Sequence, residues 1–319
     1  MKVTSLFDGI SCGRVALERV GIEVEDYFAS EIDKYAIQVS NQHFPEIVRM
    51  GDVRTISILP KTDLLLGGSP CTFWSIAKKN REIDKNGIGW ELFMHYKRAQ
   101  KHSDLFLYEN VASMPNQIRD FISEELGVEP IMIDSALVSA QQRKRYYWTN
   151  IKGVTQPEDK KIFLKDIVMD GVFPVALHNL YGGFKEKQVR VSTEKSPTLR
   201  TPAGGGHIPS FVKESLIHSP KALEYMDRQV ADGRTHWDFG YIHDIRDEKS
   251  KCLVANLFKG IPYNVFKDWD CIRKFHPVEC ERLQGLSDGY TDTVSNTQRY
   301  KQIGNGWNID TIAHILSFI

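Results

Sequence analysis

The first half of the chain alternates short apolar runs with longer stretches in which apolar and polar positions follow a helical spacing. Short apolar runs bounded by glycine or acidic residues are typical of buried strands, and the longer stretches are typical of helices that cover a sheet. The pattern predicts strands at Lys2–Leu6, Tyr27–Ser30, Ile47–Met50, Asp63–Leu66, Leu105–Tyr108 and Pro130–Ile133, and helices at Gly13–Val20, Lys34–His43, Trp90–Lys101 and Asn116–Leu126. This succession predicts an α/β fold with a Rossmann-like parallel sheet.

The pattern changes past Asn150, where glycine and proline become frequent and the expected strands are short. Regular alternation returns only in an amphipathic helix expected at Asn308–Ile319. A chain of 319 residues is also longer than one hydrophobic core usually supports. We therefore expect a first domain at residues 1–152, a second and smaller domain at 153–290, and a C-terminal segment at 291–319 that returns to the first domain.

Composition narrows the kind of protein without identifying it. The 41 basic residues balance 41 acidic ones, so a nucleic-acid surface would have to be basic locally rather than overall. Five cysteines without a CxxC pair argue against a disulfide framework and a zinc site, and they indicate a reducing compartment. We therefore expect no metal site. We also expect no membrane segment, because no apolar run is long enough to cross a bilayer.

The first strand is followed by a glycine-bearing turn at Phe7–Gly13, where a ligand can approach main-chain amides. Glu31 ends the second strand, at roughly the 20-residue distance at which a carboxylate binds ribose hydroxyls. Asp52 ends the third strand. The turn lacks the fingerprints of dinucleotide and phosphate sites, so a nucleoside ligand without phosphate, S-adenosylmethionine, fits best. A plain tight turn at Phe7–Gly13 and a helix cap at Asp52 are the alternatives.

Two reactive side chains follow buried strands. Cys71 comes after Leu64–Leu66 and Glu109 after Leu105–Tyr108. Because the carboxyl ends of parallel strands share one edge of the sheet, a thiol and a carboxyl would meet beside the ligand. A buried inert cysteine and a structural ion pair remain the alternative interpretations.

Taken in order, the motifs of the whole chain resemble those of the DNA (cytosine-5)-methyltransferase family. The first half is especially similar to the animal de novo enzymes, and the last segment to bacterial or phage enzymes. The motifs are Phe7–Gly13, Glu31, Gly51–Val53, Ser69–Cys71, Glu109–Val111, Gln141–Arg145, Glu281–Gly285 and Gly304–Gly306.

The resemblance implies an S-adenosylmethionine-dependent methyltransferase sheet with a target-recognition domain at 153–290, and it assigns roles residue by residue. Cys71 would add to carbon 6 of cytosine, Glu109 would contact ring nitrogen 3, and Arg143 and Arg145 would steady the base and the glutamate. The cofactor would contact Phe7, Asp8, Gly9, Gly13, Glu31, Ile32, Asp52, Val53, Pro70, Asn305 and Gly306. Thr198 and Arg273 would bind DNA.

The implied partner is double-stranded DNA from which the target base is flipped out. We expect a monomer in the cytoplasm of a bacterium or a phage-infected cell. Thr72 stands where many relatives have glutamine, and Ser11 and Cys12 replace a common glycine pair. Two alternatives stay open, a transfer-RNA cytosine methyltransferase and a non-catalytic DNA-binding relative.

Overall fold

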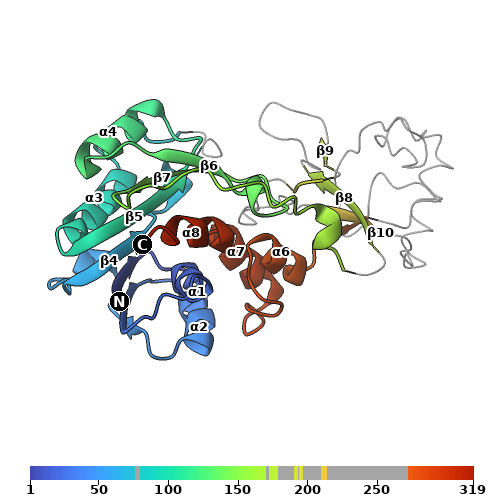
Figure 1. Ribbon diagram of the computed structural model, residues 1–319, viewed down its shortest axis with the longest axis horizontal. Coiled ribbons are helices and arrows are strands. Elements are labelled where there is room, and N and C mark those ends of the chain that lie inside the picture. Colours follow the sequence, from blue (N-terminus) through green and yellow to red (C-terminus); the bar gives the residue numbers. More distant parts are fainter. Residues whose placement is uncertain (76–79, 170–171, 179–189, 193, 197–209, 214–271) are drawn as a thin grey trace.

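A seven-stranded sheet forms the centre of the larger lobe in the computed structural model (Figure 1). The structure describes residues 1–75, 80–169, 172–178, 190–192, 194–196, 210–213 and 272–319. The strands are β1 (Lys2–Leu6), β2 (Asp26–Ser30), β3 (Val48–Arg49), β4 (Thr62–Gly67), β5 (Ser103–Val111), β6 (Ile131–Asp134) and β7 (Lys144–Thr149), in the order β3-β2-β1-β4-β5-β7-β6. All six strands predicted from the sequence are present.

The first five strands are parallel, as their apolar runs predict, whereas β7 lies antiparallel between β5 and β6. The sequence pattern predicts no strand at 144–149. The antiparallel direction has a functional consequence, because the start of β7 lies at the edge of the sheet where β5 ends. Arg145, for example, pairs with Val111, the last residue of β5.

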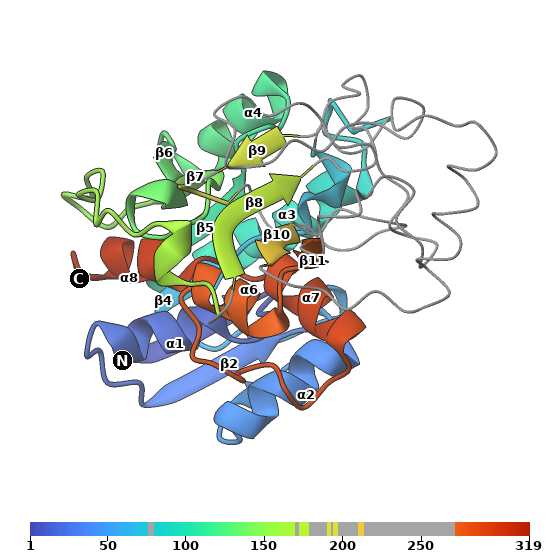
Figure 2. The same ribbon diagram turned by 90° about the vertical axis from the view of Figure 1, so that its right-hand side faces the viewer.

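Helices cover both faces of this sheet (Figures 1 and 2). One apolar cluster packs α1 (Cys12–Arg19), α2 (Lys34–His43) and α8 (Ile309–Leu316) against one face, through residues such as Leu17, Val39 and Ile312. A second cluster packs α3 (Ile88–Gln100) and α4 (Asn116–Leu126) against the other, through residues such as Phe93 and Ile118. The result is a three-layer α/β domain in which α8 packs beside α1 and α2.

Local sequence signals fix several helix ends. The Asp33 carboxylate accepts a hydrogen bond from the Tyr35 N–H at the start of α2, and the Asn308 side chain accepts one from Thr311 at the start of α8. Helix α4 ends at Gly127, whose φ of 72° is left-handed and therefore favours glycine. These caps explain why the predicted helix bounds agree closely with the observed ones.

A second sheet, of order β11-β10-β8-β9, lies at the other end of the molecule (Figure 1). It consists of β8 (Val172–His178), β9 (Arg190–Ser192), β10 (Ser210–Lys213) and β11 (Ile272–Lys274), all antiparallel. Helices α6 (Pro277–Leu283) and α7 (Asn296–Asn305) follow it. The sequence pattern predicts neither helix, because polar residues interrupt the apolar spacing in both.

Part of the segment after β11 packs on the first domain. Leu286 and Tyr290 belong to the apolar cluster of α1 and α8, and the Tyr290 hydroxyl donates to the main-chain carbonyl of Ile10. Phe275 and Leu283 pack with Ile303 of α7. We propose that the second domain ends near residue 275, before the residues that pack on α1 and α8. Among the helices of the described ranges, none is both long and apolar enough to cross a membrane.

Candidate active site

The loop that carries Cys71 is tied directly to the strand that carries Glu109. Cys71 opens the 3-10 turn η2 (Cys71–Phe73) just after β4. Before it, Ser69 is buried, its hydroxyl lies 2.6 Å from the Tyr108 hydroxyl, and its carbonyl accepts a hydrogen bond from the Asn110 side chain at 3.1 Å. At Gly68, a Cβ would lie 2.8 Å from the Glu109 carbonyl oxygen. Only glycine permits this close approach of the loop to β5.

The Glu109 carboxylate is held from two sides. Its Oε1 lies 2.8 Å from Arg145 Nε, and its Oε2 accepts a hydrogen bond from the Trp307 indole Nε1 at 3.0 Å. Glu109 lies inside β5 rather than after it, because pairing with β7 extends that strand to Val111. The residue is only 8% exposed, so few water molecules compete with these two donors.

The two arginines lie at the start of β7, Arg145 within the strand and Arg143 one residue before it. Arg143, which is 3% exposed, donates from Nη2 to the Gly306 carbonyl at 2.8 Å. Burial, together with the positive charge of Arg145, lowers the pKa of Arg143 to about 10. Arg143 therefore remains protonated at neutral pH, and it links β7 to the Gly304–Gly306 motif.

The Cys71 thiol lies within the electrostatic field of the same three side chains. Burial raises the pKa of Cys71, the negative charge of Glu109 raises it further, and the charges of Arg145 and Arg143 lower it. The net direction is upward, so the thiol is protonated at neutral pH. A thiolate at this position would be stabilised by the two guanidinium groups. The site thus brings together a cysteine, a carboxylate and two arginines, the four residues predicted to act chemically.

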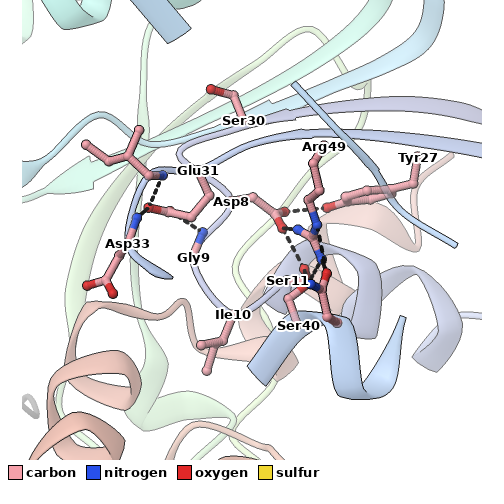
Figure 3. Close-up of polar contacts among 12 residues, drawn as sticks. Asp8, Gly9, Ile10, Ser11, Tyr27, Ser30, Glu31, Asp33, Ser40 and Arg49 are labelled. Carbon is pink, nitrogen blue, oxygen red and sulfur yellow. Dashed lines mark hydrogen bonds and ion pairs between the residues drawn. The ribbon is translucent and has the colours of Figure 1, made fainter. Parts of the chain in front are cut away.

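Glu31, the predicted ribose-binding carboxylate, follows β2 and is fixed by main-chain amides (Figure 3). Its Oε2 accepts a hydrogen bond from the N–H of Gly9, and its Oε1 accepts from the N–H groups of Ile32 and Asp33, each at 2.8 Å. The side chain of Ile32 is 68% exposed, and nothing lies within 4 Å of a Cβ built on Gly9. An oriented carboxylate, an exposed apolar side chain and open space beside a glycine fit a nucleoside cofactor.

The side chain of Asp8, another predicted cofactor residue, points into the protein beneath the turn. It is fully buried and accepts hydrogen bonds from the hydroxyls of Tyr27, at 2.9 Å, and Ser11, while Arg49 lies 3.7 Å away (Figure 3). The Ser11 hydroxyl also contacts that of Ser40. Burial raises the pKa of Asp8, and the hydrogen bonds from the hydroxyls and the charge of Arg49 reduce this rise. Asp8 therefore shapes the turn from within.

The backbone of this turn is unusual. Phe7 and Ser11 have φ values of 60° and 61°, in the left-handed region that residues other than glycine rarely occupy. Such backbone strain is concentrated at ligand-binding sites and is maintained by surrounding structure. The hydrogen bonds of Asp8 and Glu31 provide that structure.

The remaining predicted cofactor residues differ in exposure. Asp52 caps a short 3-10 turn by accepting a hydrogen bond from the Arg54 N–H. It also pairs with the Arg54 guanidinium at 2.6 Å, and the hydrogen bonds from Arg54 lower the pKa of Asp52 to about 2, so the carboxylate is ionised at neutral pH. Val53 and Gly306 are buried, whereas Pro70 and Asn305 are exposed. A Cβ on Gly13 would lie 2.7 Å from the Leu66 side chain, so this glycine allows α1 to pack closely on β4.

The DNA-binding predictions fall mostly outside the described part of the chain. Thr198 lies outside the described residues. Arg273 lies in β11, where its main chain pairs with that of Phe211 in β10. Within the described ranges, no group of three His, Cys, Asp or Glu side chains is placed to hold a metal ion.

Sequence reasoning missed three residues that order the site. Tyr108 and Asn110 flank Glu109 and anchor Ser69, and Trp307 donates to Glu109 across 198 positions. Asn110 was part of the Glu109–Val111 motif, so its position carried a signal. Trp307 directly follows the Gly304–Gly306 motif, but its partner depends on the tertiary fold.

The strand order, the helical layers and the glycine-bearing turn after β1 define the class of Rossmann-like methyltransferases. The family described as C-5 cytosine-specific DNA methylase matches residues 1–319, and the chain belongs to that family. It is 28% identical to the type II methyltransferase M1.ScrFI of Lactococcus lactis over 98% of this chain and 76% of that protein. It is 25% identical to M.NlaX of Neisseria lactamica, over 98% and 94%.

Solved structures share the fold at low sequence identity. A mutant of Spodoptera frugiperda DNMT2 superimposes with a TM-score of 0.62 at 17% identity, covering 99% of this chain and 98% of that one.

Proposed function

We propose that this DNA cytosine methyltransferase transfers a methyl group from S-adenosylmethionine to carbon 5 of a flipped-out cytosine in double-stranded DNA, through a covalent adduct on Cys71. The observation that carries the proposal is the convergence of Cys71, Glu109, Arg143 and Arg145 at one edge of the sheet, joined by a 2.8 Å ion pair and by their mutual electrostatic effects. The relatives in Lactococcus and Neisseria are named as type II methyltransferases, which belong to restriction–modification systems.

The chemistry explains why these residue types are needed. Carbon 5 of cytosine is a poor nucleophile, so the Cys71 thiolate must first add to carbon 6 and raise the electron density at carbon 5. Because burial raises the pKa of Cys71, the thiol must lose its proton as attack begins, and the charges of Arg143 and Arg145 favour that loss. As the thiolate adds, Glu109 would transfer a proton to ring nitrogen 3, which neutralises the electron pair that the ring takes up, and would accept a hydrogen bond from the exocyclic amine.

The turn at 7–13, Glu31, Ile32 and Asp52 would hold S-adenosylmethionine, which supplies the methyl group when bound. Glu31 would accept hydrogen bonds from the ribose hydroxyls, because its carboxylate is already oriented by three amides. Ile32 would pack against the adenine. After methyl transfer the proton at carbon 5 must be removed before Cys71 is eliminated, and we assign no side chain to that step.

A base inside a duplex cannot reach this buried group of side chains, so the target cytosine must rotate out of the helix. Residues 153–275, with Thr198 and Arg273, would hold the DNA. The protein would act in the cytoplasm of a bacterial or phage-infected cell. We propose that it acts as a monomer.

The test is transfer of tritiated methyl groups from S-adenosylmethionine to duplex DNA and to transfer RNA in parallel. We expect label in DNA from the wild-type protein and none from Cys71→Ala. Label in RNA alone would favour the transfer-RNA enzyme, and DNA binding without label in either substrate would favour a non-catalytic relative. The Cys280→Ala variant is the matched control, because Cys280 is a buried cysteine of α6 that belongs to the apolar cluster containing Ile303 of α7.

A further inference from the structure

We propose that Trp307 is a positioning residue for the Glu109 carboxyl, an inference that rests on the proposed function. The Trp307 indole Nε1 donates to Glu109 Oε2 at 3.0 Å, while Arg145 Nε lies 2.8 Å from Oε1. The two oxygens of one carboxylate are thus bound by donors from segments far apart in the sequence. The orientation of the Glu109 carboxylate is therefore set by these two donors.

Two donors restrict the Glu109 carboxylate more than a single donor would. The terminal torsion of a glutamate side chain is soft, so a carboxylate with one partner can rotate about its last bond. An ion pair at Oε1 and an indole N–H at Oε2 together fix both the position and the plane of the group. The remaining lone pairs then have one orientation relative to a bound base. Small misplacements of a reacting group are costly in rate, so this orientation matters for turnover.

Trp307 is itself fixed by the cofactor side of the site. The residue before it, Gly306, packs closely on Cys12 at the end of the turn at 7–13, since a Cβ on Gly306 would lie 3.1 Å from the Cys12 sulfur. The Trp307 ring lies 3.7 Å from where a Cβ on Gly13 would be, and its indole nitrogen lies 3.3 Å from where one on Gly68 would be. The ring therefore fills the space between the turn of the first strand and the loop that leads to Cys71. This arrangement connects the cofactor turn to the catalytic carboxyl.

A tryptophan that served packing alone would not need its N–H directed at a carboxylate. The protein offers a comparison in Trp148, whose Nε1 donates to the Ser123 hydroxyl at 2.9 Å on the α4 side of the sheet. Trp307→Phe and Trp148→Phe each remove one indole hydrogen bond, but only the first removes a bond to Glu109. The pair separates loss of any indole N–H from loss of this one.

The experiment measures kcat on duplex DNA at saturating S-adenosylmethionine, and the cofactor Kd by direct titration, for the wild type and both variants. A hydrogen bond to a charged group commonly contributes enough for Trp307→Phe to lower kcat about tenfold or more. We expect its cofactor Kd to stay within about twofold of wild type, because a phenyl ring still fills part of the space that the indole occupied. Trp148→Phe should keep the wild-type kcat.

If Trp307→Phe does not fold, site-specific replacement of Trp307 by 3-benzothienylalanine keeps the shape of the indole and exchanges the N–H for sulfur. A tenfold loss of kcat in that protein supports the proposal. A wild-type kcat in either variant overturns it, as does a weakened cofactor Kd with unchanged kcat. Absence of activity in the wild-type protein would instead refute the proposed function, so the two failures are distinguishable.

Discussion

The ion pair between Arg145 and Glu109 makes a prediction about stability as well as catalysis. Arg145 Nε lies 2.8 Å from Glu109 Oε1, and the two side chains are 12% and 11% exposed. Replacing Arg145 by methionine keeps the aliphatic length of the side chain and removes the charge. In this variant the nearly buried Glu109 carboxylate loses its ion pair and keeps the hydrogen bond from the Trp307 indole.

The magnitude follows from the separation. Two unit charges 2.8 Å apart attract by about 6 kcal/mol at an effective dielectric constant of about 20. Part of this is recovered in the variant, because Glu109 can bind a proton and keeps its indole donor. Removing one partner of a buried pair typically costs about 3 kcal/mol or more. We therefore expect Arg145→Met to lower the free energy of unfolding by about 3 kcal/mol.

Urea unfolding followed by tryptophan fluorescence measures this loss. The double variant Arg145→Met/Glu109→Gln should recover most of it, because no unpaired charge remains buried. Asp120→Asn is the control, since it removes an ion pair to Arg119 in which Asp120 is 60% exposed, and such pairs contribute less than about 1 kcal/mol. The reasoning is refuted if Arg145→Met matches Asp120→Asn, or if the double variant is no more stable than the single one.

Two further predictions concern the thiol and the turn. Burial and the charge of Glu109 raise the pKa of Cys71, and the charge of Arg145 lowers it. Alkylation of Cys71 by iodoacetamide, measured by peptide mass spectrometry, should therefore be slow at neutral pH and accelerate as the pH rises. The midpoint of this pH profile should move up in Arg145→Gln and down in Glu109→Gln, and unmoved midpoints would contradict the assignment. Cys12, whose pKa burial raises to about 12, should stay unmodified. Tyr27→Phe removes a hydroxyl that donates to buried Asp8 and should lower the free energy of unfolding by about 1–3 kcal/mol, whereas an unchanged urea midpoint would show that Asp8 does not depend on this donor.

The parallel strands and most helices of the first domain could be predicted because their signals are local. Short runs rich in apolar residues mark the buried strands, as Leu64–Leu66 does in β4, and the predicted helices at 34–43 and 116–126 begin and end at the observed residues. Strand β7 could not be predicted in this way. It begins with the charged Lys144 and Arg145, and although the aromatic residues that follow favour a strand, nothing local indicates its antiparallel place between β5 and β6.

The active site likewise combines features that local sequence signals predict with features that depend on tertiary packing. The positions of Cys71, Glu109 and Glu31 follow from the rule that parallel strands end at one edge, and their motifs carry that signal. The direction of a side chain is set by tertiary packing, so nothing local predicted that Asp8 points into a buried network with Tyr27. Nor does any spacing rule connect Trp307 with Glu109.

The central claim is that the Cys71 sulfur forms a covalent bond with carbon 6 of the target cytosine. A duplex containing 5-fluorocytosine tests it, because fluorine at carbon 5 blocks the final proton removal and traps the adduct. After incubation with S-adenosylmethionine, proteolysis and mass spectrometry should find the modified base on the peptide that contains Cys71, and on no peptide from Cys71→Ala. An adduct on another residue, or DNA methylated by Cys71→Ala, would contradict the account.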